Sequence, residues 1–151
     1  MSERPAEYLK QRSLCGVLDL NEGTGAVLVV DDNQANMAVY QKVIGEVRGV
    51  VAKCFTNPNE ALEYLLSDRP VLAVIDYRMP DIDGFAFIQR MRSISGRHAI
   101  PIVMLTGSDD EKVRARAMVM GVLEFMKKPV DKRRLQALIT HALRMRLTEP
   151  G

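Results

Sequence analysis

Three carboxylates stand where short apolar runs end. Asp31 and Asp32 directly follow the run at residues 26–30, and Asp76 follows the run at residues 71–75. If these runs are neighbouring strands of a parallel sheet, the carboxylates converge at its carboxyl edge, where α/β sheets bind ligands. Clustered carboxylates repel one another, and a divalent cation relieves the repulsion. Because oxygen ligands with little His or Cys suit hard ions, the sequence predicts a Mg²⁺ site, with Mn²⁺ as an alternative.

Two further polar side chains end later apolar runs. Thr106 ends the run that begins at residue 102, and Lys128 follows the run at residues 123–126. A hydroxyl and an ammonium that face a carboxylate suit phosphoryl transfer to that carboxylate. In this chemistry Asp76 attacks phosphorus, a metal ion neutralises the developing charge, and Thr106 and Lys128 bind the phosphoryl oxygens. We therefore expect Asp76, Thr106 and Lys128 to perform the reaction.

The elements that must position these side chains follow from a regular alternation along the chain. Short apolar runs typical of buried strands occur at residues 26–30, 50–55, 71–75, 102–105 and 123–126. The stretches between them are long enough for crossover helices, which is the signature of βαβ units. The sequence thus predicts an α/β chain of five strands and five helices, with a parallel sheet covered on both faces.

Local signals mark several helices. Apolar residues recur at helical spacing between residues 135 and 143, which predicts a helix that packs one face against the sheet. Asn57 is a candidate N-cap, and Pro58 suits the first turn of the helix that follows. Ser108 or Asp109 is the candidate N-cap of the next-to-last helix.

Composition excludes several classes of protein. With 151 residues, 47% hydrophobic and 26% charged, the chain is typical of one folded domain. Its net charge of +2 predicts neither nucleic-acid binding nor membrane association. The two cysteines are too few for a disulfide framework, and no apolar run approaches the length of a membrane helix, so we expect a cytoplasmic protein. The nine methionines, among them Met118, Met120, Met126 and Met145, are expected mainly to fill the core, with an exposed, adaptable binding surface as the alternative.

Charge is unevenly distributed. Residues 112–147 contain ten Lys or Arg and two acidic residues, Glu124 and Asp131, an excess of 10 − 2 = +8. This segment forms either a solvated face or a surface that steers an acidic partner or a second copy of the chain.

Four motifs in order closely resemble the receiver domain of two-component response regulators. They are Asp-Asp at 31–32, Asp76 with MPDIDG at 79–84, Thr-Gly at 106–107, and Lys-Lys-Pro at 127–129. The resemblance covers residues 26–147 and implies a single doubly wound (βα)5, flavodoxin-like sheet with strand order 2-1-3-4-5. It divides the chain into an N-terminal extension (1–24), a receiver domain (25–147) and a tail or the start of a linker (148–151).

The resemblance also implies a role for each site residue. Asp76 is the expected phosphoacceptor, Asp32 a direct Mg²⁺ ligand, Asp31 a ligand largely through water, and Arg78 the donor of a backbone carbonyl to the metal. Asp81 and Asp83 are expected to serve the loop and the next helix start, with Gly84 relaxing the turn.

Switching is implied for two positions. In the family, a Thr hydroxyl moves toward the phosphoryl group while an aromatic side chain turns inward. Thr106 and Phe125 match these positions, although Phe125 lacks the hydroxyl of the more frequent Tyr.

Partners follow from the same resemblance. A histidine kinase or phosphotransfer protein is the expected phosphoryl donor, and a homodimer or output partner is expected on the face of the fourth helix, fifth strand and fifth helix. No direct nucleic-acid binding, no membrane contact and no turnover activity beyond self-catalysed phosphorylation and dephosphorylation are expected.

Two alternatives remain open. A phosphohydrolase of the haloacid-dehalogenase type also uses an Asp nucleophile with Mg²⁺, but it predicts Asp-x-Asp at the first strand, where this chain has Asp-Asp-Asn at 31–33. A receiver-like domain that serves only protein contacts is the second alternative.

Overall fold

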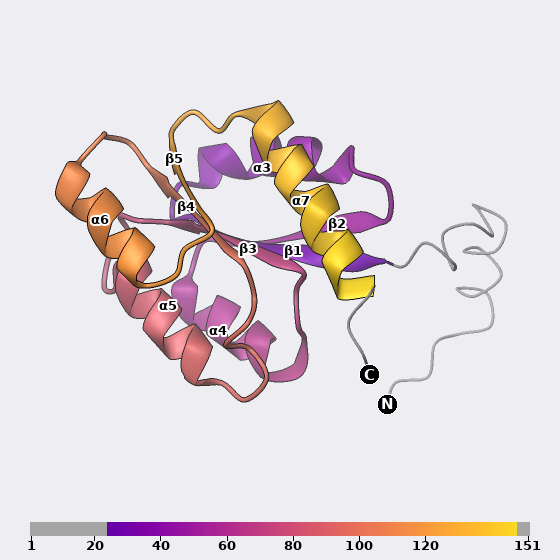
Figure 1. The fold of residues 1–151 in the computed structure, drawn as a ribbon, viewed down its shortest axis with the longest axis horizontal. Coiled ribbons are helices and arrows are strands. Elements are labelled where there is room, and N and C mark those ends of the chain that lie inside the picture. Colours follow the sequence, from indigo (N-terminus) through magenta and orange to yellow (C-terminus); the bar gives the residue numbers. More distant parts are fainter. Residues whose placement is uncertain (1–23, 148–151) are drawn as a thin grey trace, which may run out of the picture.

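The computed structural model describes residues 24–147, which form one parallel sheet with helices on both faces (Figure 1). Its strands are β1 (Gly25–Val30), β2 (Val50–Phe55), β3 (Leu72–Asp76), β4 (Ile102–Thr106) and β5 (Glu124–Lys127). Its helices are α3 (Met37–Gly45), α4 (Pro58–Ser67), α5 (Gly84–Ser93), α6 (Glu111–Val119) and α7 (Lys132–Leu147), with a short 3-10 helix, η1 (Gln34–Asn36), before α3. No helix in this range is long and apolar enough to cross a membrane.

The predicted extension and tail lie largely outside this range. Residues 1–23 and 148–151 are outside the described residues, so the domain boundaries at residues 24 and 147 stay predictions.

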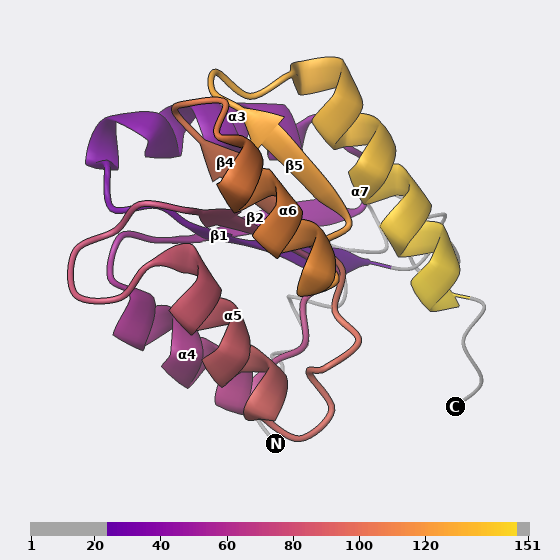
Figure 2. The same ribbon diagram turned by 60° about the vertical axis from the view of Figure 1, so that its left-hand side comes forward.

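The strand order is β2-β1-β3-β4-β5, and every pair is parallel. This confirms the doubly wound, flavodoxin-like sheet that the family resemblance implied. Helices α3 and α7 cover one face, and α4, α5 and α6 cover the other, as Figure 2 shows from the side.

Two cores form because strand side chains alternate between the faces of the sheet. In β1, Val27 and Val29 pack under α3 and α7, whereas Leu28 and Val30 pack under α4 and α5. The central strands β3 and β4 are buried along their whole length, which explains why they appear in the sequence as continuous apolar runs.

Helix starts agree with the sequence at one position and differ at another. Asn57 caps α4 as predicted, since its side chain accepts a hydrogen bond from the Asn59 N–H at 2.8 Å. The prediction of Ser108 or Asp109 as the cap of α6 is wrong, because Asp110 is the N-cap. The Asp110 carboxylate accepts hydrogen bonds from the Lys112 and Val113 N–H groups, whereas the Ser108 backbone bonds with the Thr106 hydroxyl.

The methionine prediction holds only in part. Met37, Met91, Met104 and Met126 are buried in the two cores. Met118 and Met145 expose 59% and 55% of their surface, so at these two positions the expectation of core filling is wrong. Both lie on helices that the sheet contacts along one side only, α6 and α7, and the exposed side carries them.

Gly84, the first residue of α5, is required by close packing rather than by a special backbone conformation. A Cβ built there would lie 2.8 Å from the Asp76 carbonyl oxygen and 3.1 Å from the Tyr77 Cα. The expected relaxation of the turn is therefore not the reason for glycine, whose φ lies outside the positive range that favours it.

Gly84→Ala is expected to destabilise the fold by about 1–3 kcal/mol, because backbone atoms at the end of β3 must shift. Urea unfolding of the parent and the variant measures the loss. Gly107→Ala is the matched control, since a Cβ at Gly107 has nothing within 4 Å. Equal unfolding midpoints for the two alanine variants would contradict the packing explanation.

Candidate functional site

Three carboxylates converge at the carboxyl edge of the sheet. Oxygens of Asp31, Asp32 and Asp76 all lie within 4.8 Å of one another. Asp31 directly follows β1 and Asp76 ends β3, and these strands are neighbours. Asp31 and Asp76 are buried, whereas Asp32 is exposed. The donors are hard carboxylate oxygens with no His or Cys among them, a set that fits Mg²⁺ or Mn²⁺.

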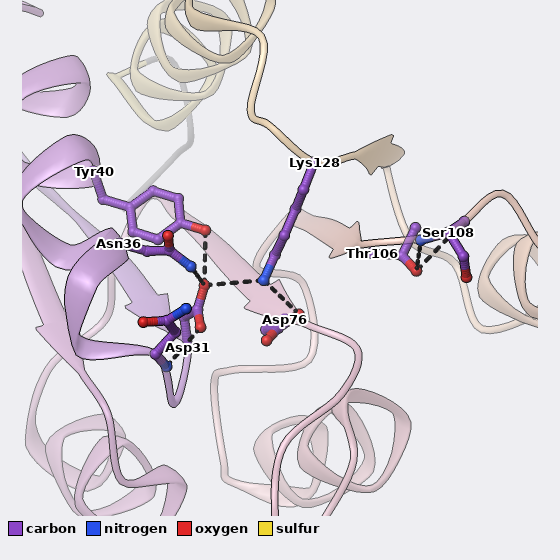
Figure 3. A network of polar contacts seen from close by, with 8 residues as sticks. Asp31, Asn36, Tyr40, Asp76, Thr106, Ser108 and Lys128 are labelled. Atoms are coloured by element: carbon purple, nitrogen blue, oxygen red, sulfur yellow. Dashed lines mark hydrogen bonds and ion pairs between the residues drawn. The ribbon is translucent and has the colours of Figure 1, made fainter.

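Lys128 places its ammonium between two of these carboxylates. Its Nζ lies 3.3 Å from Asp31 Oδ2 and 3.2 Å from Asp76 Oδ1, as the dashed lines in Figure 3 mark. The backbone is held by a hydrogen bond from the Lys128 N–H to the Thr106 carbonyl, which extends the pairing of β5 with β4 by one residue. The predicted convergence of Asp31, Asp76 and Lys128 is thus present in the fold.

Asp31 is the most restrained of the three carboxylates. Its Oδ1 accepts a hydrogen bond from the Asn33 N–H at 2.9 Å. Its Oδ2 accepts from Asn36 Nδ2 at 3.0 Å, from the Tyr40 hydroxyl at 2.9 Å and from Lys128. Both oxygens of Asp31 are therefore occupied by protein donors, while no protein donor to the Asp32 carboxylate is found among the described residues.

Sequence analysis missed Asn36 and Tyr40. The two residues lie four positions apart where η1 leads into α3, so they face the same side and reach the same carboxylate. A polar pair at helical spacing just after an acidic strand end was the available signal.

The pKa values of Asp76 and Asp31 are shifted in opposite directions. Burial, together with the negative charge of Asp31, raises the pKa of Asp76 to about 6, although Lys128 and a backbone hydrogen bond from Arg78 oppose this. Burial also acts to raise the pKa of Asp31, but its hydrogen bonds and the charge on Lys128 outweigh burial and lower it. Asp31 is therefore a fixed anion, and Asp76 is the carboxylate whose charge is least favourable.

The two neighbouring carboxylates raise the pKa of Lys128. Burial acts to lower it, but the charges of Asp76 and Asp31 outweigh burial. The side chain thus carries a full positive charge at neutral pH.

Thr106 lies apart from the carboxylates, and Phe125 lies in the core beneath α4, α5 and α6. The Thr106 hydroxyl donates to the Ser108 carbonyl at 3.1 Å and accepts from the Ser108 N–H at 3.3 Å, to one side of the Lys128 cluster (Figure 3). Phe125 is 7% exposed, and the guanidinium of Arg114 on α6 lies 4.9 Å from its ring centroid. Phe125 is therefore already buried while Thr106 is bonded to Ser108.

The loop after β3 borders an open cavity of about 420 Å³ beside the carboxylates. Its walls are Asp32, Tyr77, Arg78, Met79, Pro80 and Asp83. Asp83 caps α5 by accepting from the Ala86 N–H at 2.9 Å, which confirms its predicted role at the helix start. Asp81 takes a positive φ of 74° in the same loop. This cavity gives the exposed side of the site access to solvent.

Comparison with known proteins supports one family. The family model of the response regulator receiver domain matches residues 27–140 of this chain. The chain is 32% identical over 121 residues to the cyclic di-GMP phosphodiesterase response regulator RpfG of Xanthomonas campestris, a match that covers 80% of this chain and 32% of that protein. The chain thus spans about a third of the length of that relative.

Solved structures show the same fold. A response regulator receiver protein from Pseudomonas putida has a TM-score of 0.71 and 32% identity, covering 78% of this chain and 97% of that one. The receiver domain of sensor histidine kinase PA1611 from Pseudomonas aeruginosa, which holds a magnesium ion in its active-site cleft, has a TM-score of 0.70 and 21% identity, covering 80% and 98%. From its sequence match and its fold, the chain belongs to the response regulator receiver domain family of two-component signalling.

Proposed function

We propose that this receiver domain is a phosphoryl-accepting switch in which Asp76 takes a phosphoryl group from a histidine kinase or phosphotransfer protein. One observation carries the proposal: the buried Asp76 carboxylate lies beside Asp31 and Asp32 and within 3.2 Å of the Lys128 ammonium. A nucleophilic carboxylate, an anionic pocket for a cation and a nearby positive charge are the parts that phosphoryl transfer to aspartate needs.

Asp32, Asp76 and the backbone carbonyl of Arg78 would hold Mg²⁺ directly, and Asp31 would act largely through water. The oxygen-only donor set and the magnesium ion in the PA1611 receiver support this assignment, and Mn²⁺ suits the same donors. The division between Asp31 and Asp32 agrees with their hydrogen bonds, because four protein donors already occupy Asp31 whereas Asp32 is exposed. When bound, the cation offsets the negative charge that develops on the phosphoryl oxygens.

The chain's own residues perform the transfer. An oxygen of Asp76 forms a bond to phosphorus while the bond from phosphorus to the donor breaks, and the donor leaves with that electron pair. Lys128, which holds Asp76 at 3.2 Å, then has a phosphoryl oxygen as its new anionic partner. The result is an acyl phosphate at the end of β3.

Switching would begin at Thr106. Its hydroxyl bonds to Ser108 in this structure, so a phosphoryl group on Asp76 has to draw it away from that partner. We propose that the rearrangement reaches Phe125 and, through its contact with Arg114, helix α6. The proposed contact surface for a second copy or an output partner is therefore the face of α6, β5 and α7.

That face is basic but partly paired. Arg134 forms an ion pair with Glu124 at 2.8 Å, and Lys132 forms one with Glu46 at 2.8 Å. Glu124 is already counted in the +8 excess of residues 112–147, and Glu46 offsets only one further charge, so the face suits an acidic partner. We propose no direct nucleic-acid or membrane contact, a cytoplasmic location, and no turnover chemistry beyond self-catalysed phosphorylation and dephosphorylation.

Incubation with acetyl phosphate tests the chemistry. Intact-mass spectrometry is expected to show one phosphoryl adduct in the presence of Mg²⁺ and none after chelation, because the anionic pocket then has no cation to neutralise the incoming phosphate. An equal yield with and without Mg²⁺ would contradict the proposed role of the carboxylate cluster.

Beryllofluoride, which mimics the phosphoryl group, separates a short-lived adduct from a domain that serves only protein contacts. With Mg²⁺ it is expected to shift the Thr106 methyl and Phe125 ring resonances. A protein that forms no adduct and shows no such shift would be a contact module, and the proposed function would be wrong.

A further inference from the structure

Tyr40 places a buried hydroxyl on the carboxylate cluster from outside the predicted set of site residues. It lies on α3, is 3% exposed and packs in the core under α3 and α7. Its hydroxyl donates to Asp31 Oδ2 at 2.9 Å. The ring of Tyr40 is sufficient for packing in the core, so the hydrogen bond from its hydroxyl to Asp31 is a contribution separate from packing.

The same oxygen receives two other donors. Asn36 Nδ2 lies 3.0 Å from Asp31 Oδ2 and Lys128 Nζ lies 3.3 Å from it (Figure 3). Asn36 and Tyr40 are neutral donors fixed to neighbouring turns, whereas Lys128 is charged and is shared with Asp76. Only the Lys128 contact is therefore open to exchange during the reaction.

Exchange of Lys128 has a consequence for Asp31. When the ammonium turns to a phosphoryl oxygen on Asp76, Asp31 Oδ2 keeps only Asn36 and Tyr40. Asn36, Tyr40 and Lys128, the three side-chain donors to Asp31, also border one cavity of about 380 Å³, together with Val39, Pro129 and Val130.

We propose that Tyr40 is a positioning residue for cation binding: its hydroxyl holds the Asp31 carboxylate in place and frees Lys128 from that task. The inference rests on the proposed function. Without the hydroxyl, Asp31 loses one orienting donor and depends more on Lys128. The ammonium then stays in the carboxylate cluster, where it competes with a divalent cation.

Tyr40→Phe tests the inference, because the substitution keeps the ring and removes only the hydroxyl. Mn²⁺ binding is measured by the loss of the free-ion electron paramagnetic resonance signal on titration of the full chain. We expect the dissociation constant for Mn²⁺ to rise roughly three- to tenfold, the effect of losing one ordinary hydrogen bond, because the hydroxyl orients Asp31 and does not itself contact the cation. Tyr64→Phe is the matched control, since Tyr64 lies half-buried on α4 beside Phe55, away from the carboxylates.

A second readout separates positioning from a general structural defect. The rate of phosphorylation by acetyl phosphate is measured across a Mg²⁺ titration. Tyr40→Phe is expected to need more Mg²⁺ for half-maximal rate but to reach the rate of the parent at saturation. A merely structural role would lower the rate at every Mg²⁺ concentration.

The outcomes are distinguishable. A raised dissociation constant in Tyr40→Phe alone, with the rate recovered at saturating Mg²⁺, supports the inference. An unchanged or lower dissociation constant overturns it, as does a rate that stays low at saturation. A parent protein that binds no Mn²⁺ and forms no adduct contradicts the proposed function itself, on which the inference depends.

Discussion

Asp76→Asn is expected to abolish the phosphoryl adduct completely and, at the same time, to make the metal-free protein more stable at neutral pH. The adduct is lost because the amide has no anionic oxygen to attack phosphorus. The gain in stability arises because Asp76 is buried next to the fixed anion Asp31, so its charge opposes folding. We expect a gain of about 1–3 kcal/mol in the free energy of unfolding.

The pH dependence of this gain has a definite sign. The pKa of Asp76 is about 6 in the folded protein, against a reference value of 3.8. Below pH 3.8 the carboxyl is protonated in both states and contributes nothing. As pH rises from there through 6, the unfolded chain ionises more readily, and the parent loses stability relative to Asp76→Asn. The difference is then constant at higher pH.

Urea unfolding of both proteins in chelator, at several pH values from 4 upward, measures the difference. Asp68→Asn is the control, because Asp68 is an exposed carboxylate at the end of α4. Asp68→Asn is expected to keep the adduct and to leave the free energy of unfolding close to that of the parent, because the substitution is on the surface. If Asp76→Asn gains as many phosphoryl groups per chain as the parent, another residue accepts the phosphoryl group.

Lys128→Met is expected to have the second-largest effect, with the opposite sign on stability. Asp31 and Asp76 then lose the ammonium at 3.3 and 3.2 Å and face each other without a cation. Removing one partner of a buried ion pair is strongly destabilising, but Lys128 is 27% exposed, so solvent reduces the effect. We expect a loss of about 1–3 kcal/mol in metal-free protein at neutral pH.

Three conditions are expected to reduce the difference in stability between the parent and Lys128→Met. The raised pKa of Lys128 means that its contribution is fully present at neutral pH and disappears only as the ammonium itself deprotonates in strong alkali. At acid pH the loss of stability in Lys128→Met becomes smaller, because protonation of Asp76 removes the negative charge that the ammonium no longer compensates. Mg²⁺ is also expected to raise the melting temperature of Lys128→Met more than that of the parent, since no ammonium competes with it.

Thermal unfolding with and without Mg²⁺ measures these effects. Lys127→Met is the matched control, because the neighbouring Lys127 is exposed on β5, and no ion pair is found for it in the part of the chain that the structure describes. If both lysine variants lose the same stability, the ion pairs of Lys128 contribute nothing specific. Loss of Mg²⁺ stabilisation in Lys128→Met would contradict the proposed competition between ammonium and metal.

The strands and the positions of the main polar residues were accessible from the sequence for a simple reason. Buried strands of a parallel sheet are apolar on both faces, so β3 and β4 appear as continuous apolar runs. Parallel strands also end at one edge, so polar residues at run ends, such as Asp76 and Thr106, are placed at that edge whatever the strand order. The order itself came from the family resemblance, because alternation of strands and helices is compatible with several orders.

Tertiary structure alone decided which polar groups pair. Lys128 and Asp31 are 97 residues apart, and their contact depends on the order and register of the strands between them. The contact of Tyr40 with Asp31 depends on where α3 lies against the sheet. Local patterns encode which face of an element is apolar, whereas the choice among nearby hydrogen-bond partners follows from distances that only the packed elements set.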